Sequence, residues 1–431
     1  MKRVVLSYVY FQASTLSDRD SIKQKPEYIC RTCQQQTIDT LIDFGNQPRC
    51  FDFLESNEEI PALFDFCVGQ CNSCGVIQLN NPIPAKQLHP KFDWIRNKEP
   101  DKHADLLVKD LLGYLENDRS KVLFLSVYDK KLYDIINGNV NEQAYLLDPS
   151  KDLGIEESYP GQALIQEQIT PEKSENLCKK IGKFDLIVTC RLLEHAHDTH
   201  RFILGLTQLL KPNGRLVIEV PDSTKSLLQG DIAMLWEEHT NYFTPESLKH
   251  GFSAIGFQLE KYIGYHYSQE DAIVAIFQQQ RSTENLNVSM PVGELSLGKM
   301  FLKKIDYLRS IIVDELCELK QKYGKIAIFG AGHRTVMFLN LLKLNNIVSY
   351  VIDDDQNKQG LIIPKAGLEI HKSELIIIEN IGVCLLSVNI EIEERIIDII
   401  TRKACRNIQY FSISPDSNNA LPVLKSLNSI N

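Results

Sequence analysis

Two pairs of cysteines stand near the start of the chain: Cys30 and Cys33 in "CRTC", and Cys71 and Cys74 in "CNSC", with 37 residues between the pairs. A CxxC turn places two thiolates on one side of a tight loop, and two such turns complete a tetrahedron around Zn²⁺. Four thiolates leave the ion no open position, so this site is predicted to stabilise a fold rather than do chemistry. Unligated cysteines and a redox CxxC are the alternatives, although a redox motif needs only one pair.

The remaining cysteines favour a metal over disulfides. Six of the eleven lie between residues 30 and 74, and the other five are scattered singly. This distribution is not that of a disulfide-stabilised secreted domain. Cys50 and Cys67 are left over from the two pairs and are expected to fill space.

Two histidine motifs offer acid–base chemistry. Glu194 and His195 lie in "RLLEHAHD", directly after the apolar run "FDLIVTC", and Glu238 and His239 lie in "LWEEHTNYF". Ligands of open α/β sheets gather at the carboxyl ends of the strands, and imidazole titrates near the working pH. Glu238 could orient or tune His239. Alternatively, "EEH" is only the polar start of a helix.

A strand–turn–helix pattern precedes these motifs, in "SKVLFLSVYDKKLYDII". A nucleotide-binding enzyme keeps a glycine-rich turn at this place, but here the turn runs from Ser126 to Lys130 without glycine. Asp148 ends the next apolar run, where a carboxylate can accept hydrogen bonds from both ribose hydroxyls. An exposed turn aspartate before proline is the alternative.

The elements that position these residues alternate between strand and helix. The strand candidates are the short apolar runs 122–125, 144–147, 184–188 and 215–220, and a helix before the last ends at "LLKPNG". Alternation of this kind predicts a parallel sheet with helices on both faces.

A second, smaller α/β unit follows a polar stretch at "RSTENLNVSMPVGELSLG" and a helix that ends at Gly324. Its runs are "KIAIFGAGHRTVMFLNLL", "SYVIDDD", "LIIIEN" and "VCLLSVN". The GxG turn is a weak signal for a dinucleotide, so an NAD-dependent enzyme is a further but weaker hypothesis. Asp353 ends a strand, where it could reach a ribose or a hydroxyl, and a purely structural lobe is the alternative.

The composition excludes some partners. The net charge is −9, and no long Lys/Arg run offsets it, so nucleic acid is an unexpected partner. No segment approaches the ~20 apolar residues that span a bilayer. The first 27 residues are interpreted as a loose extension rather than a secretion signal, and the cytoplasm is the default location.

The order of motifs resembles that of the sugar C-methyltransferases. The motifs are "CRTC", "DFGNQP", "CNSCGVIQL", "FDLIVTCRLLEHAHD", "LLKPNGRLVIEVPD", "LWEEHTNYFTPESL", "FGAGHRT" and "DDDQNKQG". This resemblance covers nearly all of the chain after about Tyr28. It implies an α/β protein with a small N-terminal zinc module (28–88), a central Rossmann-like class I methyltransferase domain (89–285) that uses S-adenosylmethionine (SAM), and a smaller C-terminal Rossmann-like domain (286–431), after an extension at 1–27.

The resemblance also implies roles for individual residues. His239 would be the general base that takes the proton from the carbon to be methylated, and His195 would line the acceptor pocket. Asp129 stands where the family carries an acid and could hold the methionine amino group. The residues implied to contact the acceptor, a small molecule such as a nucleotide sugar, are Trp236, His333, Arg334 and Asp353.

The chain departs from the family at two places. The family's Glu-x-Gly-x-x-x-Gly becomes Phe124, Ser126 and Lys130, and its tyrosine before the later histidine becomes Trp236. Glycine lets the backbone approach the methionine part of SAM closely, and Ser126 is small enough to be tolerated there. Two hypotheses follow: a SAM-dependent C-methyltransferase, or a non-catalytic relative that binds partners after losing SAM.

Overall fold

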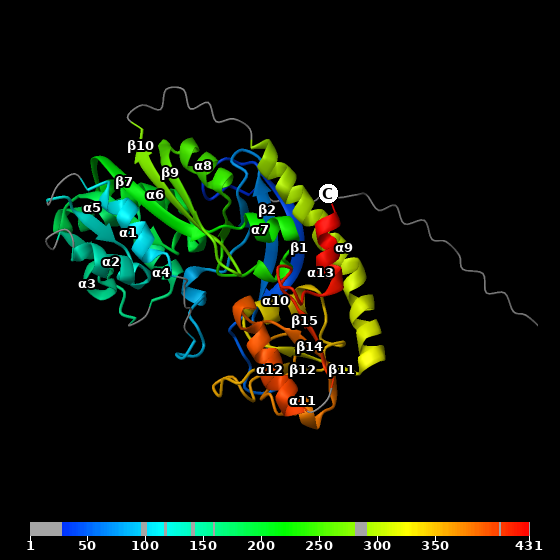
Figure 1. Ribbon diagram of the computed structural model, residues 1–431. Coiled ribbons are helices and arrows are strands. Elements are labelled where there is room, and N and C mark those ends of the chain that lie inside the picture. Colours follow the sequence, from blue (N-terminus) through cyan, green and yellow to red (C-terminus); the bar gives the residue numbers. More distant parts are fainter. Residues whose placement is uncertain are drawn as a thin grey trace, which may run out of the picture.

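The computed structural model describes residues 28–95, 101–115, 119–138, 143–157, 160–280, 291–404 and 407–430 (Figure 1). The expected loose extension, and residues 281–290 of the expected polar linker, lie outside these ranges. The described chain forms three sheets. None of its described helices combines the length and apolar character needed to cross a bilayer.

The first sheet is antiparallel and holds the cysteine pairs. Its strands, in spatial order, are β1 (Ile38–Pro48), β2 (Leu63–Cys71), β3 (Ile77–Leu79) and β8 (Asn241–Tyr242). The last strand comes from the middle of the chain, about 160 residues after β3, which joins the N-terminal module to the segment that carries His239.

The second sheet has six strands in the order β5-β4-β6-β7-β10-β9. Its strands are β4 (Val122–Phe124), β5 (Ala144–Leu146), β6 (Phe184–Cys190), β7 (Leu210–Pro221), β9 (Phe257–Tyr265) and β10 (Ala272–Gln279). The first four are parallel, but β10 runs antiparallel to both of its neighbours. The expected parallel sheet is therefore mixed at one edge, where the chain returns through a hairpin.

Helices cover both faces of this sheet, as expected. The helices of one face, α1 (Ala104–Leu112) and α2 (Lys130–Asn137), pack on alternate strand residues such as Phe124 and Val188. The opposite face packs against α5 (Pro171–Ile181), α6 (Thr199–Leu209) and α8 (Pro245–Ala254). Shorter helices are α3 (Pro149–Leu153), α4 (Gln162–Glu167) and α7 (Thr224–Gln229).

The third sheet is wholly parallel, in the order β13-β12-β11-β14-β15. Its strands are β11 (Lys325–Phe329), β12 (Tyr350–Ile352), β13 (Ile370–His371), β14 (Ile381–Leu386) and β15 (Gln409–Ser412). Its helices are α10 (His333–Leu341), α11 (Leu375–Ile378), α12 (Glu393–Ala404) and α13 (Pro422–Ser426). The run "LIIIEN" thus forms a short helix, and the strand begins after it.

Helix α9 (Val292–Tyr323) connects the parts of the molecule. It ends at Gly324, whose φ of 101° favours glycine. Its apolar stripe, which includes Phe301, Ile305 and Leu308, is buried in one core with residues of the first and third sheets. In Figure 1 it runs along the outer side of β1 and reaches the C-terminal unit. The expected helix that ends at Gly324 is therefore confirmed.

Candidate functional site

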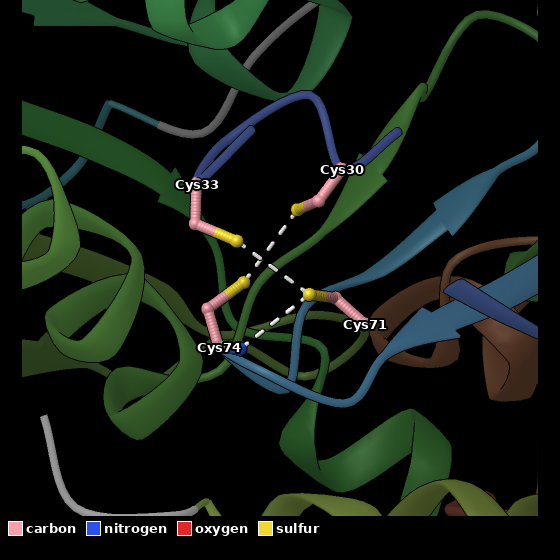
Figure 2. A group of neighbouring side chains, drawn as sticks. All are labelled: Cys30, Cys33, Cys71 and Cys74. Atoms are coloured by element: carbon pink, nitrogen blue, oxygen red, sulfur yellow. Dashed lines mark hydrogen bonds between the residues drawn. The ribbon is translucent and has the colours of Figure 1, made fainter. Parts of the chain in front are cut away.

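Four cysteine thiols converge where β2 ends (Figure 2). Cys30 and Cys33 come from the turn before β1, Cys71 is the last residue of β2, and Cys74 closes the next turn. The Sγ atoms of Cys30 and Cys74 lie 3.6 Å apart, as do those of Cys33 and Cys71. A tetrahedron with Zn–S bonds of ~2.3 Å requires about 3.8 Å between sulfurs. The four thiols therefore fit a zinc ion.

Backbone N–H groups complete the environment of this centre. The amides of Ser73 and Cys74 point at Cys71 Sγ, at 3.4 and 3.5 Å, and Thr37 Oγ1 lies 3.4 Å from the same sulfur. Such contacts to a ligand sulfur stabilise its thiolate form and orient it. All four cysteines are buried, so the centre has no access for a substrate.

Asp129, which belongs to the glycine-free turn, binds backbone amides at the start of that turn and at the end of β6. Asp129 is fully buried, and its carboxylate accepts hydrogen bonds from the amides of Leu125 and Ser126 at 2.9 Å and of Cys190 at 2.8 Å. These bonds tie the carboxyl end of β4 to that of β6. Burial raises the pKa of Asp129 to about 7, against the effect of these hydrogen bonds. Asp129 thus points into the fold.

A cavity of about 570 Å³ lies beside this turn, at the carboxyl ends of the central strands. Residues that line it include Val127, Tyr128 and Lys130 of the turn and α2, and Arg191 and Glu219 from the ends of β6 and β7. Ser126, Asp129 and Asp148 are not among the lining residues. Asp148 instead caps α3 by accepting the amide of Lys151 at 2.7 Å, and it is exposed. Their cofactor roles stay predictions.

A second cavity, also of about 570 Å³, lies between the methyltransferase-like sheet and the C-terminal unit. Trp236 and His239 line it from one side, and His333 and Arg334 line it from the start of α10. The indole of Trp236 stacks on the His333 ring, with centroids 5.0 Å apart and 24° between planes. The structure therefore brings four of the predicted site residues together.

The two predicted histidines are neighbours. The His195 and His239 rings lie 4.9 Å apart in an edge-to-face arrangement. Thr240 fixes this approach, because its amide and its hydroxyl both donate to the carbonyl oxygen of Glu194, at 2.8 and 3.1 Å. Donor or acceptor atoms of Glu194, His195 and His239 all fall within 4.8 Å of one another.

Burial keeps these imidazoles neutral. Desolvation, with a smaller effect of nearby His333 and Arg191, lowers the pKa of His239 to about 3. Desolvation and the proximity of His239 lower the pKa of His195 well below its usual value. Burial beside Arg334 lowers that of His333 to about 3. Their lone pairs are therefore available at neutral pH.

Three of the predicted residues, His195, Glu238 and Asp353, are not among those that line this cavity. Asp353 accepts the amide of Ala331 at 2.8 Å and pairs with Lys358 at 2.9 Å, so it closes the GAG turn. Glu238 is half-buried and does not line the cavity, whereas its neighbour Glu237 is buried and bonds Cys50. Cys50 therefore does more than fill space. The acceptor and orienting roles stay predictions.

A buried ionic network was not anticipated from the sequence. Arg191 Nε lies 3.3 Å from Glu219 Oε1, Glu219 Oε2 lies 3.0 Å from His103 Nε2, and Tyr267 contacts the other ring nitrogen of His103 at 2.5 Å. Burial alone would raise the pKa of Glu219, but His103 and Arg191 bring it below its ordinary value. The signal in the sequence is the single acid of the apolar strand "RLVIEV".

Comparison with known sequences identifies three domains, in the order that the motifs predicted. Sequence profiles match a zinc binding domain at residues 30–89, a methyltransferase domain at 110–262 and a C-methyltransferase C-terminal domain at 275–399. The chain therefore carries a zinc binding domain, a methyltransferase domain and a C-methyltransferase C-terminal domain. The predicted resemblance and α/β fold class are thereby confirmed. The methyltransferase domain implies SAM, and the zinc domain implies zinc on the four cysteines.

Individual proteins show more distant likeness. The C-methyltransferase NovU of Streptomyces niveus is 23% identical over 238 residues, which are 53% of this chain and 56% of NovU. The chain thus spans about half the length of this curated relative. Among solved structures, magnesium protoporphyrin IX methyltransferase of Synechocystis, with bound SAH, is 10% identical (TM-score 0.29, 43% of this chain and 91% of that one). A SAM-dependent methyltransferase of Anabaena variabilis is 14% identical (TM-score 0.28, 42% and 86%).

The lining of the first cavity fits the methionine end of SAM. This end carries an ammonium and a carboxylate, and the cavity wall offers both the carboxylate of Glu219 and the cations of Lys130 and Arg191. The side chain of Asp129 leaves this space open because it turns into the fold. The absence of glycine is therefore compatible with a cofactor beside the turn.

Proposed function

We propose that this protein is a SAM-dependent C-methyltransferase of a small-molecule acceptor whose reacting carbon lies next to a carbonyl, such as a nucleotide-linked sugar. One observation carries the proposal. A cavity at the carboxyl ends of the sheet strands and a histidine-lined cavity share a wall that includes Arg191 and Asp101. Cofactor and acceptor can therefore sit side by side. SAM, when bound, supplies an electrophilic methyl group.

His239 is the proposed general base. It lines the acceptor cavity, and its low pKa leaves the imidazole unprotonated and able to accept a proton at pH 7. The rings of His195 and Trp236 pack on different sides of the His239 ring, each with its centroid 4.9 Å from that of His239. Glu238, the preceding residue of the same loop, is proposed to orient His239 or adjust its pKa.

The remaining predicted residues hold ligands in this proposal. Trp236, His333 and Arg334 contact the acceptor from the cavity wall, and Asp353 supports the turn before them. Asp148 takes the ribose of the cofactor from the end of β5. Ser126 and Asp129 act on the cofactor indirectly, because they shape the turn that carries Tyr128.

The test is methyl transfer from radiolabelled SAM to a panel of nucleoside-diphosphate ketodeoxyhexoses, with the product bond assigned by NMR. We expect a carbon-bound methyl group and a loss of at least about 100-fold in kcat for H239N. H250N, on α8 and outside both cavity walls, is the matched control and should keep wild-type activity. Transfer at the wild-type rate by H239N would remove the base assignment.

A non-catalytic binding protein is the second candidate. The observation that favours it is Tyr128, whose side chain stands beside the cofactor cavity where the family has a glycine-rich turn. Calorimetry with SAM separates the two functions. Binding in the micromolar range supports the enzyme, whereas no heat at millimolar SAM supports the binding protein.

A further inference from the structure

The proposed base, His239, is the last residue of a short turn. The carbonyl oxygen of Trp236 accepts the amide of His239 at 3.1 Å, so residues 236–239 form a turn that begins at Trp236. Both ends of this turn, Trp236 and His239, line the second cavity. The position of the imidazole in that cavity therefore depends on how the first residue of the turn is held.

The side chain of Tyr242 holds this first residue at both of its backbone polar groups. The amide of Trp236 donates to Tyr242 Oη at 2.9 Å, and the Tyr242 hydroxyl donates to the carbonyl oxygen of Trp236 at 3.1 Å. Burial raises the pKa of Tyr242 above its ordinary value, so the phenol keeps the proton that it donates. One neutral hydroxyl thus acts as acceptor and donor toward the same residue.

Tyr242 is itself fixed in the fold. It is 2% exposed and lies in β8, where it pairs with Ile77 of the first sheet. Its side chain belongs to the core cluster that also contains Trp236 and residues of α9, and its ring centroid lies 6.3 Å from that of His239. A side chain that leaves a strand and packs in a close-packed core has little room to move. The phenol therefore transmits the position of β8 to the turn.

Two other contacts of this loop act on other groups. The carboxylate of Glu237 bonds to Cys50, and Thr240 donates to the carbonyl oxygen of Glu194. The first contact holds a side chain inside the turn, and the second holds the residue after it. The backbone of Trp236, where the turn starts, is held by the phenol.

Proton abstraction is sensitive to the position of the base. In the proposed reaction the C–H bond of the acceptor breaks, its electron pair forms the C=C bond of an enolate, and the proton goes to a ring nitrogen of His239. The base must come within about 2.6–3.2 Å of the atom that carries this proton. A misplacement of about 1 Å can lower a rate by about 100-fold, although the base remains chemically intact.

We propose that Tyr242 is a positioning residue, whose hydroxyl fixes the start of the turn and thereby sets His239 within reach of the acceptor proton. This inference rests on the proposed function and adds to it a residue that acts through the base. Tyr242 is not among the residues that line either cavity, so its effect on the reaction is expected to pass through His239.

A double-mutant cycle tests whether Tyr242 acts through His239. The acceptor identified in the transfer assay is incubated in D₂O without SAM, and exchange of the proton on the reacting carbon is followed by NMR. The proteins compared are wild type, Y242F, H239N and Y242F/H239N. We expect Y242F to lower the exchange rate of wild type by about 10- to 100-fold. In the H239N background the same change should alter the rate by less than about twofold, because the effects of residues that act as one unit are not additive.

Two control variants separate positioning from a loss of stability. Y307F makes the same chemical change at an exposed tyrosine of α9 and should keep the wild-type exchange rate. I312V shortens a side chain of α9 in the core cluster that contains Tyr242, so it should lower stability but keep the exchange rate. Urea unfolding gives the folded fraction of every variant. The SAM affinity of Y242F, measured by calorimetry, should equal that of wild type, because Tyr242 does not line the first cavity.

The result also separates this inference from the proposed function. If wild-type protein methylates none of the sugars, the proposed function and this inference fall together. If it methylates one, exchange by Y242F within about twofold of wild type overturns the role of Tyr242 alone. An equal loss in the wild-type and H239N backgrounds, or a matching loss in I312V, also overturns it, because the effect would then be general instead of passing through His239.

Discussion

The carboxylate of Glu237 accepts two hydrogen bonds from Cys50, from its amide at 2.5 Å and from its thiol at 3.0 Å. Both residues are buried, and burial raises the pKa of Glu237. Cys50 follows β1 of the zinc-binding domain, whereas Glu237 lies between Trp236 and the proposed base. The pair therefore fixes the loop that carries Trp236 and His239, which line the second cavity, to the N-terminal domain.

Removing this carboxylate should loosen the loop that carries Trp236. We expect E237A to lower the free energy of unfolding by about 2–4 kcal/mol, because two buried donors lose their acceptor. In a W94F background Trp236 is the sole tryptophan, so its emission should shift to the red. C67A, a change at another buried cysteine of the same sheet, should leave the emission unchanged. An unfolding free energy within about 0.5 kcal/mol of the parent would contradict the assignment.

The four-cysteine centre predicts about one zinc ion per chain. Atomic emission should find this metal in wild type and in C67A, and should find it lost in C33A/C71A, since two thiolates cannot hold the ion tightly. Loss of the metal should lower the free energy of unfolding by several kcal/mol. Unchanged zinc content in C33A/C71A would show that the metal lies elsewhere.

Asp129 should be a structural residue of the turn. The carboxylate of Asp129 accepts three backbone amides, whereas the side-chain NH₂ group of an asparagine cannot accept any of them. At least one buried amide therefore loses its acceptor in D129N. We expect this change to lower the free energy of unfolding, measured in urea, by about 1–3 kcal/mol. D134N, on the exposed side of α2, makes the same chemical change outside the turn and should cost less than about 0.5 kcal/mol. Similar values for the two variants would argue against a buried anchor.

The low pKa of His239 predicts a pH-dependent stability difference. Between about pH 3 and 6.5 the unfolded chain binds a proton at this residue and the folded protein does not, so His239 lowers stability as the pH falls. The difference in unfolding free energy between H239N and wild type should therefore change by about 1.4 kcal/mol from pH 5.5 to 4.5, in favour of H239N. The opposing contributions of Asp129 and Glu237 cancel in this difference. A difference that stays constant over this range would show that His239 is protonated in the folded state.

Local sequence patterns predicted much of the fold. The CxxC spacing predicted the four-thiol cluster because each turn brings its own pair of cysteines together. Only the approach of the two turns to each other depends on the tertiary structure. Apolar runs with helices between them predicted the central strands. The antiparallel β10 and the helix at Leu375–Ile378 were missed, because a short apolar run has the same local signal in either direction and in either structure.

The long-range partners of the site could not be predicted in this way. The contact of Glu237 with Cys50 joins residues 187 positions apart, and that of His103 with Glu219 joins residues 116 apart. Sequence spacing says nothing about such pairs. Arg191 was passed over because an arginine after a strand is ordinarily a solvated side chain.

Strand β8 begins two residues after His239 and completes the edge of the sheet that carries the cysteine centre. The cysteine centre therefore anchors, from a distance, the loop that carries the proposed base. A preparation short of zinc should contain a sub-population with a misaligned base, and its specific activity should track metal occupancy more closely than SAM affinity does.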